Sequence, residues 1–212
     1  VAGSAIDMRN WMDAAPSILM AWYPGEQGGN GLADVVFGEV NPSARLPITF
    51  PRSLAQYPDE FHSLGTEIAY KEGVFVGYRY FDQQRLKPLF PFGYGLSYTS
   101  FEYSNLSVEQ REGTVVVEVD VKNAGPVDGD EVVQLYVQDE HSSVERPAKE
   151  LKHFAKIGLK AGETQTVIFE LDDAAFTFWD PASSGWKLES GRFVIQVGGS
   201  SEHLTLKKGI RL

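Results

Sequence analysis

The chain has 212 residues, enough for one large domain or two small ones, and its composition is typical of a globular protein, with 42% hydrophobic and 23% charged residues. A formal net charge of −10 argues against nucleic acid and anionic membranes as partners, because both require a basic face, whereas a neutral sugar is indifferent to it. Cysteine is absent, which excludes disulfides, thiolate catalysis and cysteine metal sites and leaves the cellular compartment open. No apolar run approaches the ~20 residues of a membrane span.

Residues 1–51 have the mixed pattern of the end of an α/β domain. Residues 11–15 predict a short helix that stops at Pro16, because proline inside a helix removes a hydrogen bond. Residues 18–22 (ILMAW) are a continuous apolar run, which is typical of a strand covered on both faces. The opening stretch VAGSAIDM reads as the end of a strand, so we expect the chain to be the C-terminal part of a longer protein.

A helix and a short strand follow in this region. Residues 30–37 carry apolar side chains at helical spacing, and Gly38 comes next, where a helix C-cap often lies. Pro42 and Pro51 flank residues 46–50 and Pro47 lies among them, so those residues predict only a short or edge strand, because proline cannot donate to a sheet ladder.

Residues 52–100 form an aromatic-rich segment that is broken by glycine and proline. Its aromatic residues are Tyr57, Phe61, Tyr70, Phe75, Tyr78, Tyr80, Phe81, Phe90, Phe92, Tyr94 and Tyr98. We expect an ordered connection with one or two short strands, such as residues 74–81 (VFVGYRYF). Burial of each aromatic ring contributes about 2–3 kcal/mol, so the segment should pack against another part of the protein, whether inside this chain or outside it.

From Phe101 onward the sequence has the pattern of an all-β domain. Valine alternates with charged residues in TVVVEVDVKNAG, and apolar residues alternate again in DEVVQLYVQDE, which is the period of a half-buried antiparallel strand. The turn cluster NAGPVDGD joins the two. Further strands are predicted at ELKHFAKIGL, TQTVIFEL, RFVIQVGGS and LTLKKGIRL. About seven short strands at this spacing predict an immunoglobulin-like sandwich.

In residues 21–42 (AWYPGEQGGNGLADVVFGEVNP), the glycines at positions 25, 28, 29 and 31 lie between an apolar run and a predicted helix, the arrangement of many phosphate sites. The loop has no lysine and no complete G-x-G-x-x-G motif, so nucleotide binding is not favoured. Glu26 is open to two interpretations, a general acid or a carboxylate that favours the dipole of the following helix. The second is favoured, because glycoside hydrolysis requires two carboxylates flanking the bond.

Other polar residues give weaker signals. The histidines lack metal-binding spacing, no G-x-S-x-G motif is present, and no D-x-D-x-D-G loop supports a calcium site. These histidines are His62, His141, His153 and His203. A group of acidic residues is interpreted as a solvated acidic face, with calcium binding as the weaker alternative. Its members are Glu131, Asp139, Glu140 and Glu145.

Two tryptophans, Trp179 and Trp186, flank the sequence DPASSG, which predicts a hairpin loop. Exposed tryptophan rings can stack on sugars. In a sandwich, tryptophan is more often a core or domain-contact residue, and that interpretation is favoured.

Several stretches together resemble glycoside hydrolase family 3. Residues 18–51 resemble the closing strand, loop and helix of that family's α/β sandwich domain. The motifs YKEGVFVGYRYFD and PLFPFGYGLSYTSF are similar to its link into the last domain. The motifs GDEVVQLYVQD, RPAKELKHFAKIGLKAGET and GRFVIQVGGSS are similar to its fibronectin type III-like domain. The resemblance covers nearly the whole chain.

The resemblance implies a β-glucosidase-like or β-xylosidase-like enzyme that trims terminal β-linked sugars with retention. In that family the nucleophile is an aspartate of an N-terminal barrel, and the acid/base is a glutamate on a loop before the VAGSAID-like strand. Neither motif occurs in this chain, and Glu26 corresponds to a loop glutamate of PGEQGG. We therefore assign no catalytic, cofactor-binding or metal-binding residue and no cofactor.

The expected organisation is the end of an α/β domain at residues 1–51, a connecting segment at 52–100 and a sandwich at 101–212. The expected role is the non-catalytic C-terminal portion of a retaining β-glycosidase, which braces the catalytic domains. The expected partners are a β-linked oligosaccharide or glycoside, bound through the catalytic domains, and a second copy of the protein in a homodimer. The alternative is a free-standing carbohydrate-binding or adhesion module with an immunoglobulin-like fold.

Overall fold

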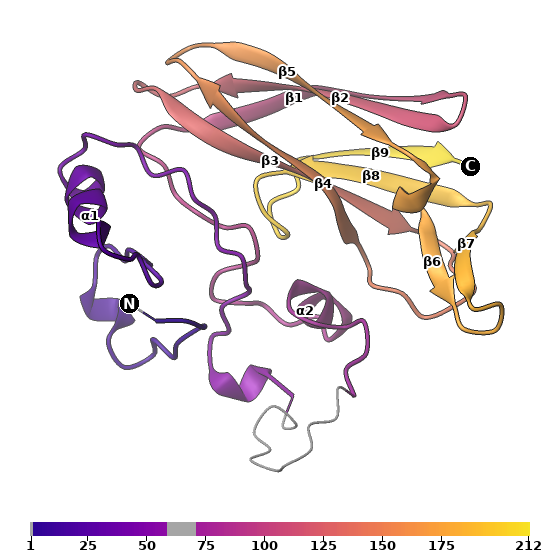
Figure 1. The fold of residues 1–212 in the computed structure, drawn as a ribbon, viewed down its shortest axis with the longest axis horizontal. Coiled ribbons are helices and arrows are strands. Elements are labelled where there is room, and N and C mark those ends of the chain that lie inside the picture. The colour runs from indigo at the N-terminus through magenta and orange to yellow at the C-terminus, as the bar shows by residue number, and fades with distance from the viewer. Residues whose placement is uncertain (1, 59–70) are drawn as a thin grey trace.

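The computed structural model describes residues 2–58 and 71–212 (Figure 1). A mixed N-terminal region with few helices precedes antiparallel β-sheet that begins at Phe101. This arrangement confirms the predicted fold class, an α/β remnant followed by an all-β immunoglobulin-like sandwich. Within the described residues, none of the helices is long and apolar enough to cross a membrane.

The N-terminal region contains the 3-10 turns Met12–Ala14 and Leu54–Gln56 and the helix α1 (Gly28–Val36). The helix expected at residues 30–37 is confirmed, with an earlier start. Gly38 follows it at φ +81°, and its N–H donates to the carbonyl of Val35 at 3.1 Å. Glycine suits this left-handed position because it lacks a Cβ.

The strand predicted at residues 18–22 is wrong. The structure has no strand at these positions, and Ile18 and Leu19 are 38% and 48% exposed. A strand depends on hydrogen bonds to a neighbouring strand, and the described part of the chain supplies no such neighbour. The apolar run at residues 18–22 therefore lies partly exposed on the surface, where burial against another part of the protein would be favourable.

The strand predicted at residues 74–81 is also wrong, because that stretch leads into the helix α2 (Tyr78–Gln83). Gly77, at φ +56°, breaks the chain direction just before the helix. Tyr78 and Phe81 are three residues apart, so a helix places both on one face, and Phe81 is buried. The edge strand expected at residues 46–50 is reduced to an isolated bridge between Phe50 and Phe90.

The β region forms a sandwich of two antiparallel sheets and a separate hairpin. One sheet has the order β1–β2–β5, the other has the order β4–β3–β8–β9, and β6 pairs with β7. The strands are β1 (Phe101–Arg111), β2 (Thr114–Asn123), β3 (Gly129–Asp139), β4 (Glu150–Leu159), β5 (Thr164–Leu171), β6 (Thr177–Asp180), β7 (Gly185–Leu188), β8 (Arg192–Gly198) and β9 (Leu206–Arg211). These bounds confirm the strands predicted from the alternating pattern and the hairpin around DPASSG.

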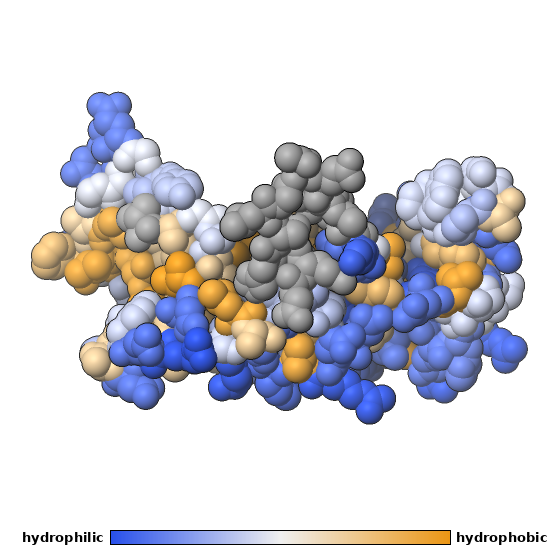
Figure 2. All heavy atoms as spheres, turned by 90° about the horizontal axis from the view of Figure 1, so that it is seen from below, coloured by the Kyte–Doolittle hydropathy of each residue, from blue (hydrophilic) through white to orange (hydrophobic). Residues whose placement is uncertain are grey.

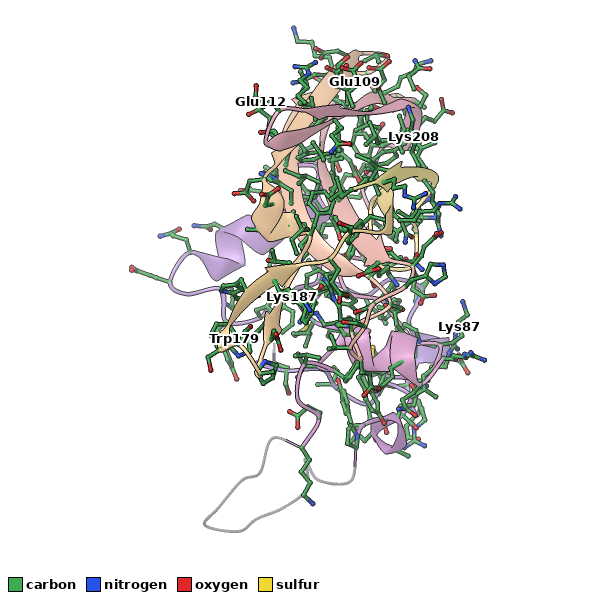
Figure 3. All side chains as sticks on the ribbon, turned by 90° about the vertical axis from the view of Figure 1, so that its right-hand side faces the viewer. Lys87, Glu109, Glu112, Trp179, Lys187 and Lys208 are labelled. Atoms are coloured by element: carbon green, nitrogen blue, oxygen red, sulfur yellow. The ribbon has the colours of Figure 1, made fainter. Side chains whose placement is uncertain are left out.

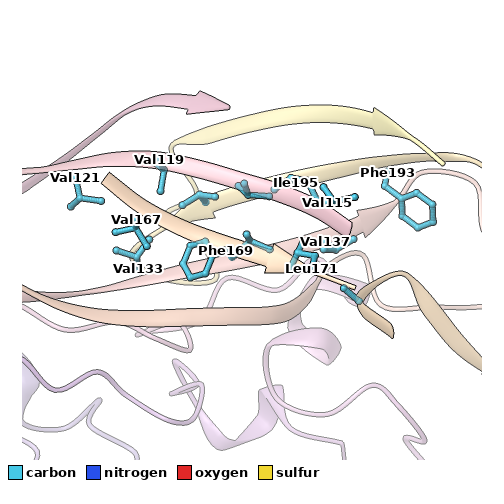
Figure 4. Close-up of a cluster of buried hydrophobic side chains, with 14 of the residues drawn as sticks. Val115, Val119, Val121, Val133, Val137, Val167, Phe169, Leu171, Phe193 and Ile195 are labelled. Carbon is cyan, nitrogen blue, oxygen red and sulfur yellow. The ribbon is translucent and has the colours of Figure 1, made fainter. Parts of the chain in front are cut away.

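The core lies between the two sheets (Figure 4). Val117 and Val119 of β2, Leu135 of β3 and Ile195 of β8 have no exposed surface. Each fully buried aliphatic side chain of this kind stabilises the fold by about 1.5–3 kcal/mol. The sandwich therefore has an apolar core of its own.

The aromatic segment packs on the sandwich, as expected for a segment with so many rings. We call the described residues 41–58 and 71–100 the strap, which runs beside β3 and β4 in Figure 1. The ring of Tyr78 lies 5.7 Å from that of Tyr136 in β3 and 5.3 Å from that of Phe92. Phe61, His62 and Tyr70 lie outside the described residues.

Candidate functional site

The glycine-rich loop is a tight corner in front of α1. Gly25 has φ +71°, and Gly28 is buried against Pro24, where an added Cβ would lie 2.5 Å from the Pro24 Cγ. Glu26 is exposed and lies two residues before the helix, near its N-terminus as expected. Among the hydrogen bonds of the described residues none involves the Glu26 carboxylate, so its proposed interaction with the helix remains a prediction.

The strap and the sandwich meet at a buried triad of Arg45, Tyr103 and Glu131. Arg45 Nη2 lies 2.5 Å from Glu131 Oε2, and the side chains of this ion pair are only 8% and 6% exposed. The Tyr103 hydroxyl donates to Glu131 Oε1 at 2.7 Å. Burial, reinforced by the Glu131 carboxylate, raises the pKa of Tyr103, so the phenol stays protonated and remains a donor. The triad thus joins three segments through one carboxylate.

The predicted solvated acidic face is wrong for two of its members, Glu131 and Asp139. Glu131 is buried in this triad, and Asp139 pairs with Arg146 at 3.3 Å with both side chains under a tenth exposed. Both acids occupy odd-numbered positions of β3, as the core residue Leu135 does. Because alternate residues of a strand face the same side, the sequence pattern could have predicted their burial. A carboxylate that points into the protein interior requires a cation as partner, because an unpaired buried charge is costly.

Asn41 joins the strap to the turn between β2 and β3. Its Nδ2 donates to the carbonyl of Asp128 at 2.9 Å, and its Oδ1 accepts from the N–H of Tyr98 at 2.8 Å and the hydroxyl of Ser97 at 2.9 Å. One amide side chain therefore connects segments that lie 87 residues apart in the sequence.

A second junction surrounds Gln134, which is buried in β3. Its Nε2 donates to the carbonyl of Gly93 at 3.3 Å and to that of Gly199 at 2.7 Å, and its Oε1 accepts from the Tyr136 hydroxyl at 2.7 Å. Gly93 has φ +81°, and a Cβ there would lie 2.3 Å from the Gln134 Oε1. Burial, with smaller contributions from Tyr78 and Asp82, raises the pKa of Tyr136. The close approach requires glycine at position 93.

A charge cluster fixes α2 against the start of β4. Asp82 in α2 pairs with Lys149 at 2.6 Å, and Glu150 pairs with Arg146 at 3.0 Å and with Arg79 at 3.5 Å. Burial raises the pKa of Asp82 although Lys149 opposes this shift. Burial also disfavours the ionised form of Glu150, but Lys152 together with the arginines outweighs burial and lowers the pKa of that carboxylate.

The tryptophan hairpin projects below the sandwich in Figure 1. Trp179 in β6 is directly opposite Trp186 in β7, and their rings are 5.8 Å apart at an interplanar angle of 81°. They are 52% and 71% exposed, so within the described chain they are not core residues, and the alternative that they contact another domain stays a prediction.

The buried polar groups described above connect separate segments of the chain. The carboxylates of Glu131, Asp139, Asp82 and Glu150 are each paired with a cationic side chain. Within residues 2–58 and 71–212, no three of the potential metal-ligating side chains form a group able to hold a metal ion. The sequence did not identify Arg45, Tyr103, Gln134 or Asn41, whose partners lie far away along the chain.

Comparisons with known proteins match the N-terminal region and the sandwich to two different family models. Residues 1–98 match the glycosyl hydrolase family 3 C-terminal domain, and residues 131–201 match a fibronectin type III-like domain. The chain is 48% identical over 216 residues to thermostable β-glucosidase B of Acetivibrio thermocellus, covering 99% of this chain and 28% of that protein.

Solved structures show the same similarity. A family 3 β-glucosidase of Bifidobacterium adolescentis gives a TM-score of 0.94 at 39% identity, over 100% of this chain and 32% of the other. A β-glucosidase of Kluyveromyces marxianus in complex with glucose gives 0.94 at 36% identity, over 100% and 25%. The chain therefore spans about a quarter to a third of the length of these relatives.

Proposed function

We propose that this chain, which belongs to glycoside hydrolase family 3 and corresponds to the C-terminal part of its β-glucosidases, braces the catalytic domains of a retaining β-glycosidase. The whole enzyme would hydrolyse terminal β-linked sugars of the β-glucosidase or β-xylosidase type. Support for the substrate class comes from relatives that are β-glucosidases, one of them solved with glucose. The reaction itself belongs to residues outside this chain.

The observation that carries the bracing role is the buried triad of Arg45, Tyr103 and Glu131. Breaking a buried ion pair by removing one partner typically costs 3–5 kcal/mol, because the remaining charge is left without compensation. Such a junction resists separation of the strap from the sandwich. The N-terminal region is therefore held in one orientation relative to the sandwich.

A second observation is the apolar surface of the N-terminal region, which gathers at the left of Figure 2. Large side chains of the N-terminal region are strongly exposed, among them Tyr23 at 77%, Val36 at 67% and Phe37 at 81%. Contiguous apolar surface of this kind usually marks an interface. We propose that the preceding part of the polypeptide covers it, so that the sandwich, the strap and the catalytic domains form one stack.

This proposal keeps the division into residues 1–51, 52–100 and 101–212 and assigns no catalytic, cofactor or metal residue to any of them. It follows that the 212-residue chain alone is inactive, because both catalytic carboxylates of the resembling family fall outside it. Glu26 has no partner carboxylate assigned to it and is exposed at a loop tip.

The test compares the chain alone with the protein encoded by the chain together with its upstream coding region. Turnover of p-nitrophenyl β-glucoside and β-xyloside is measured for both. We expect turnover only from the longer protein, and the Glu26→Gln substitution should leave that turnover unchanged. Turnover by the short chain that disappears in Glu26→Gln would contradict the proposal and make Glu26 catalytic.

A further inference from the structure

The tryptophan hairpin, β6 and β7 with the turn between them, carries two large aromatic rings on a face that the described chain does not cover. Figure 3 labels Trp179 and Lys187, which both belong to this hairpin. Because side chains alternate across a strand, the pair Trp179 and Trp186 lies on one face and Phe178 with Lys187 on the other. Large apolar side chains that gather on a protein surface are informative, because such residues are usually buried.

The opposite face fixes the hairpin in place. Phe178 is buried, with Arg146 Cζ 5.5 Å and Lys187 Nζ 5.9 Å from its ring centre. Arg146 also donates to the carbonyl of Thr177 at 3.3 Å and belongs to the charge cluster at β4. The hairpin is therefore anchored, and the two indoles are held in place before any ligand arrives.

The turn is also internally ordered. Asp180 Oδ1 accepts from the N–H of Ala182 at 3.0 Å, and its Oδ2 accepts from the Ser183 hydroxyl at 2.8 Å. A rigid aromatic platform loses little conformational entropy on binding, which favours affinity from a small contact area. Neither indole N–H donates a hydrogen bond within the described residues, so neither donor is committed to a partner there.

The size of the platform distinguishes between possible occupants. An aromatic side chain offers about 150–250 Å² of surface, so the exposed parts of the two rings amount to roughly 300 Å² at most. A stable protein–protein interface needs about 800 Å² from each partner. The patch alone is too small for a second copy of this chain and suits a small ligand.

We propose that Trp179 and Trp186 bind a neutral saccharide. A sugar ring presents a flat C–H face that fits an indole face and a hydroxyl edge that can accept from an indole N–H. Neutrality matters because a chain of net charge −10 disfavours anionic ligands. The choice of β-linked glucose units as the ligand, rather than saccharide binding itself, rests on the proposed function.

The test follows the four indole N–H signals of the whole 212-residue chain by NMR during titration with cellotetraose and, separately, maltotetraose. Trp11 and Trp22 serve as internal references, since neither belongs to the hairpin. We expect saturable shifts of the Trp179 and Trp186 signals, at least tenfold weaker binding in Trp186→Ala, and unchanged binding in Trp11→Ala. The wild-type signals alone remain decisive if Trp186→Ala fails to fold.

Three results would overturn saccharide binding. These are no shift with either sugar up to about 10 mM, where even millimolar affinity would saturate, shifts confined to Trp11 and Trp22, or hairpin shifts that follow protein concentration instead of sugar. A response to maltotetraose alone would support the platform and contradict the β-linkage taken from the proposed function. Hydrolysis by the longer protein is measured independently, so failure of one proposal is distinguishable from failure of the other.

Discussion

The sandwich and the N-terminal region differ in how they satisfy their apolar side chains. The sandwich buries a cluster of valine, leucine, isoleucine and phenylalanine side chains between two of its own sheets. In the described N-terminal region the buried apolar side chains include Met8, Phe50 and Phe81, while Tyr23 and Phe37 are mostly exposed. One region carries its own core, and the other depends on contacts made with the sandwich and, by our proposal, with domains outside the chain.

This difference shows that composition alone does not reveal whether a region can form a hydrophobic core by itself. Both regions are rich in apolar residues, but only the sandwich repeats them at period two over several strands, so that its faces can close on one another. The strap compensates by using buried polar groups, such as the Arg45–Glu131 pair, to attach to the sandwich.

The largest expected contrast is between two phenylalanines. Phe169→Ala in the core should lower the free energy of unfolding by about 3–5 kcal/mol, because Phe169 is 1% exposed and its removal leaves a cavity. Phe37→Ala, at 81% exposure, should change it by about 0.5 kcal/mol or less. Urea unfolding of the 212-residue chain measures both. A large loss in Phe37→Ala would show that the N-terminal surface is already covered in the isolated chain.

The next contrast concerns buried and exposed ion pairs. Glu131→Ala should cost about 3–5 kcal/mol, because Arg45 is left buried without a counter-charge. Glu202→Ala is the matched control, since its partner Lys87 is 79% exposed, and it should cost at most about 1 kcal/mol. The double variant Arg45→Met with Glu131→Leu should recover most of the loss. Equal costs for Glu131→Ala and Glu202→Ala in urea unfolding would contradict the importance of the triad.

A smaller effect is expected from glycines with positive φ. Gly93→Ala and Gly113→Ala share the backbone strain of about 1–2 kcal/mol, but only Gly93 also approaches Gln134. Gly93→Ala should therefore be the more destabilising of the two. In a Gln134→Ala background the costs of the two glycine substitutions should become equal, which a double-mutant cycle by thermal unfolding measures. A persistent difference would rule out the contact with Gln134 as its cause.

The smallest effect concerns acid stability. The folded pKa of Glu150 lies below its ordinary value of 4.5, so its contribution is present above that pH and is lost as pH falls through the folded pKa. The free energy of unfolding of Glu150→Gln should therefore fall less than that of the wild type between about pH 5 and pH 3. Glu109→Gln, at an exposed pair, should follow the wild type. Identical pH profiles for all three proteins would contradict the role of Glu150.

The sequence predicted the β region well because alternation in strands such as β2 and β3 reports burial directly. It failed at residues 74–81, where aromatics crowded together satisfy strand and helix spacing alike and Gly77 decides between them. It failed at residues 18–22 because an apolar run does not state which partner covers it.

The candidate site was less predictable for a physical reason. The alternation of residues along β3 could have identified Glu131 and Asp139 as buried acids. It could not have identified Arg45, which lies 86 residues from Glu131 and meets it only through the path of the strap. The boundaries at residues 51 and 100 remain predictions.

The most direct test of the bracing account is thermal inactivation of the longer protein that includes the upstream region. Glucosidase activity is assayed at low temperature after heating the wild type, Glu131→Ala and the control Glu202→Ala. The account predicts unchanged KM and kcat before heating in all three, with much faster inactivation of Glu131→Ala alone. Inactivation of Glu131→Ala at the wild-type rate would contradict the claim that this junction braces the catalytic domains.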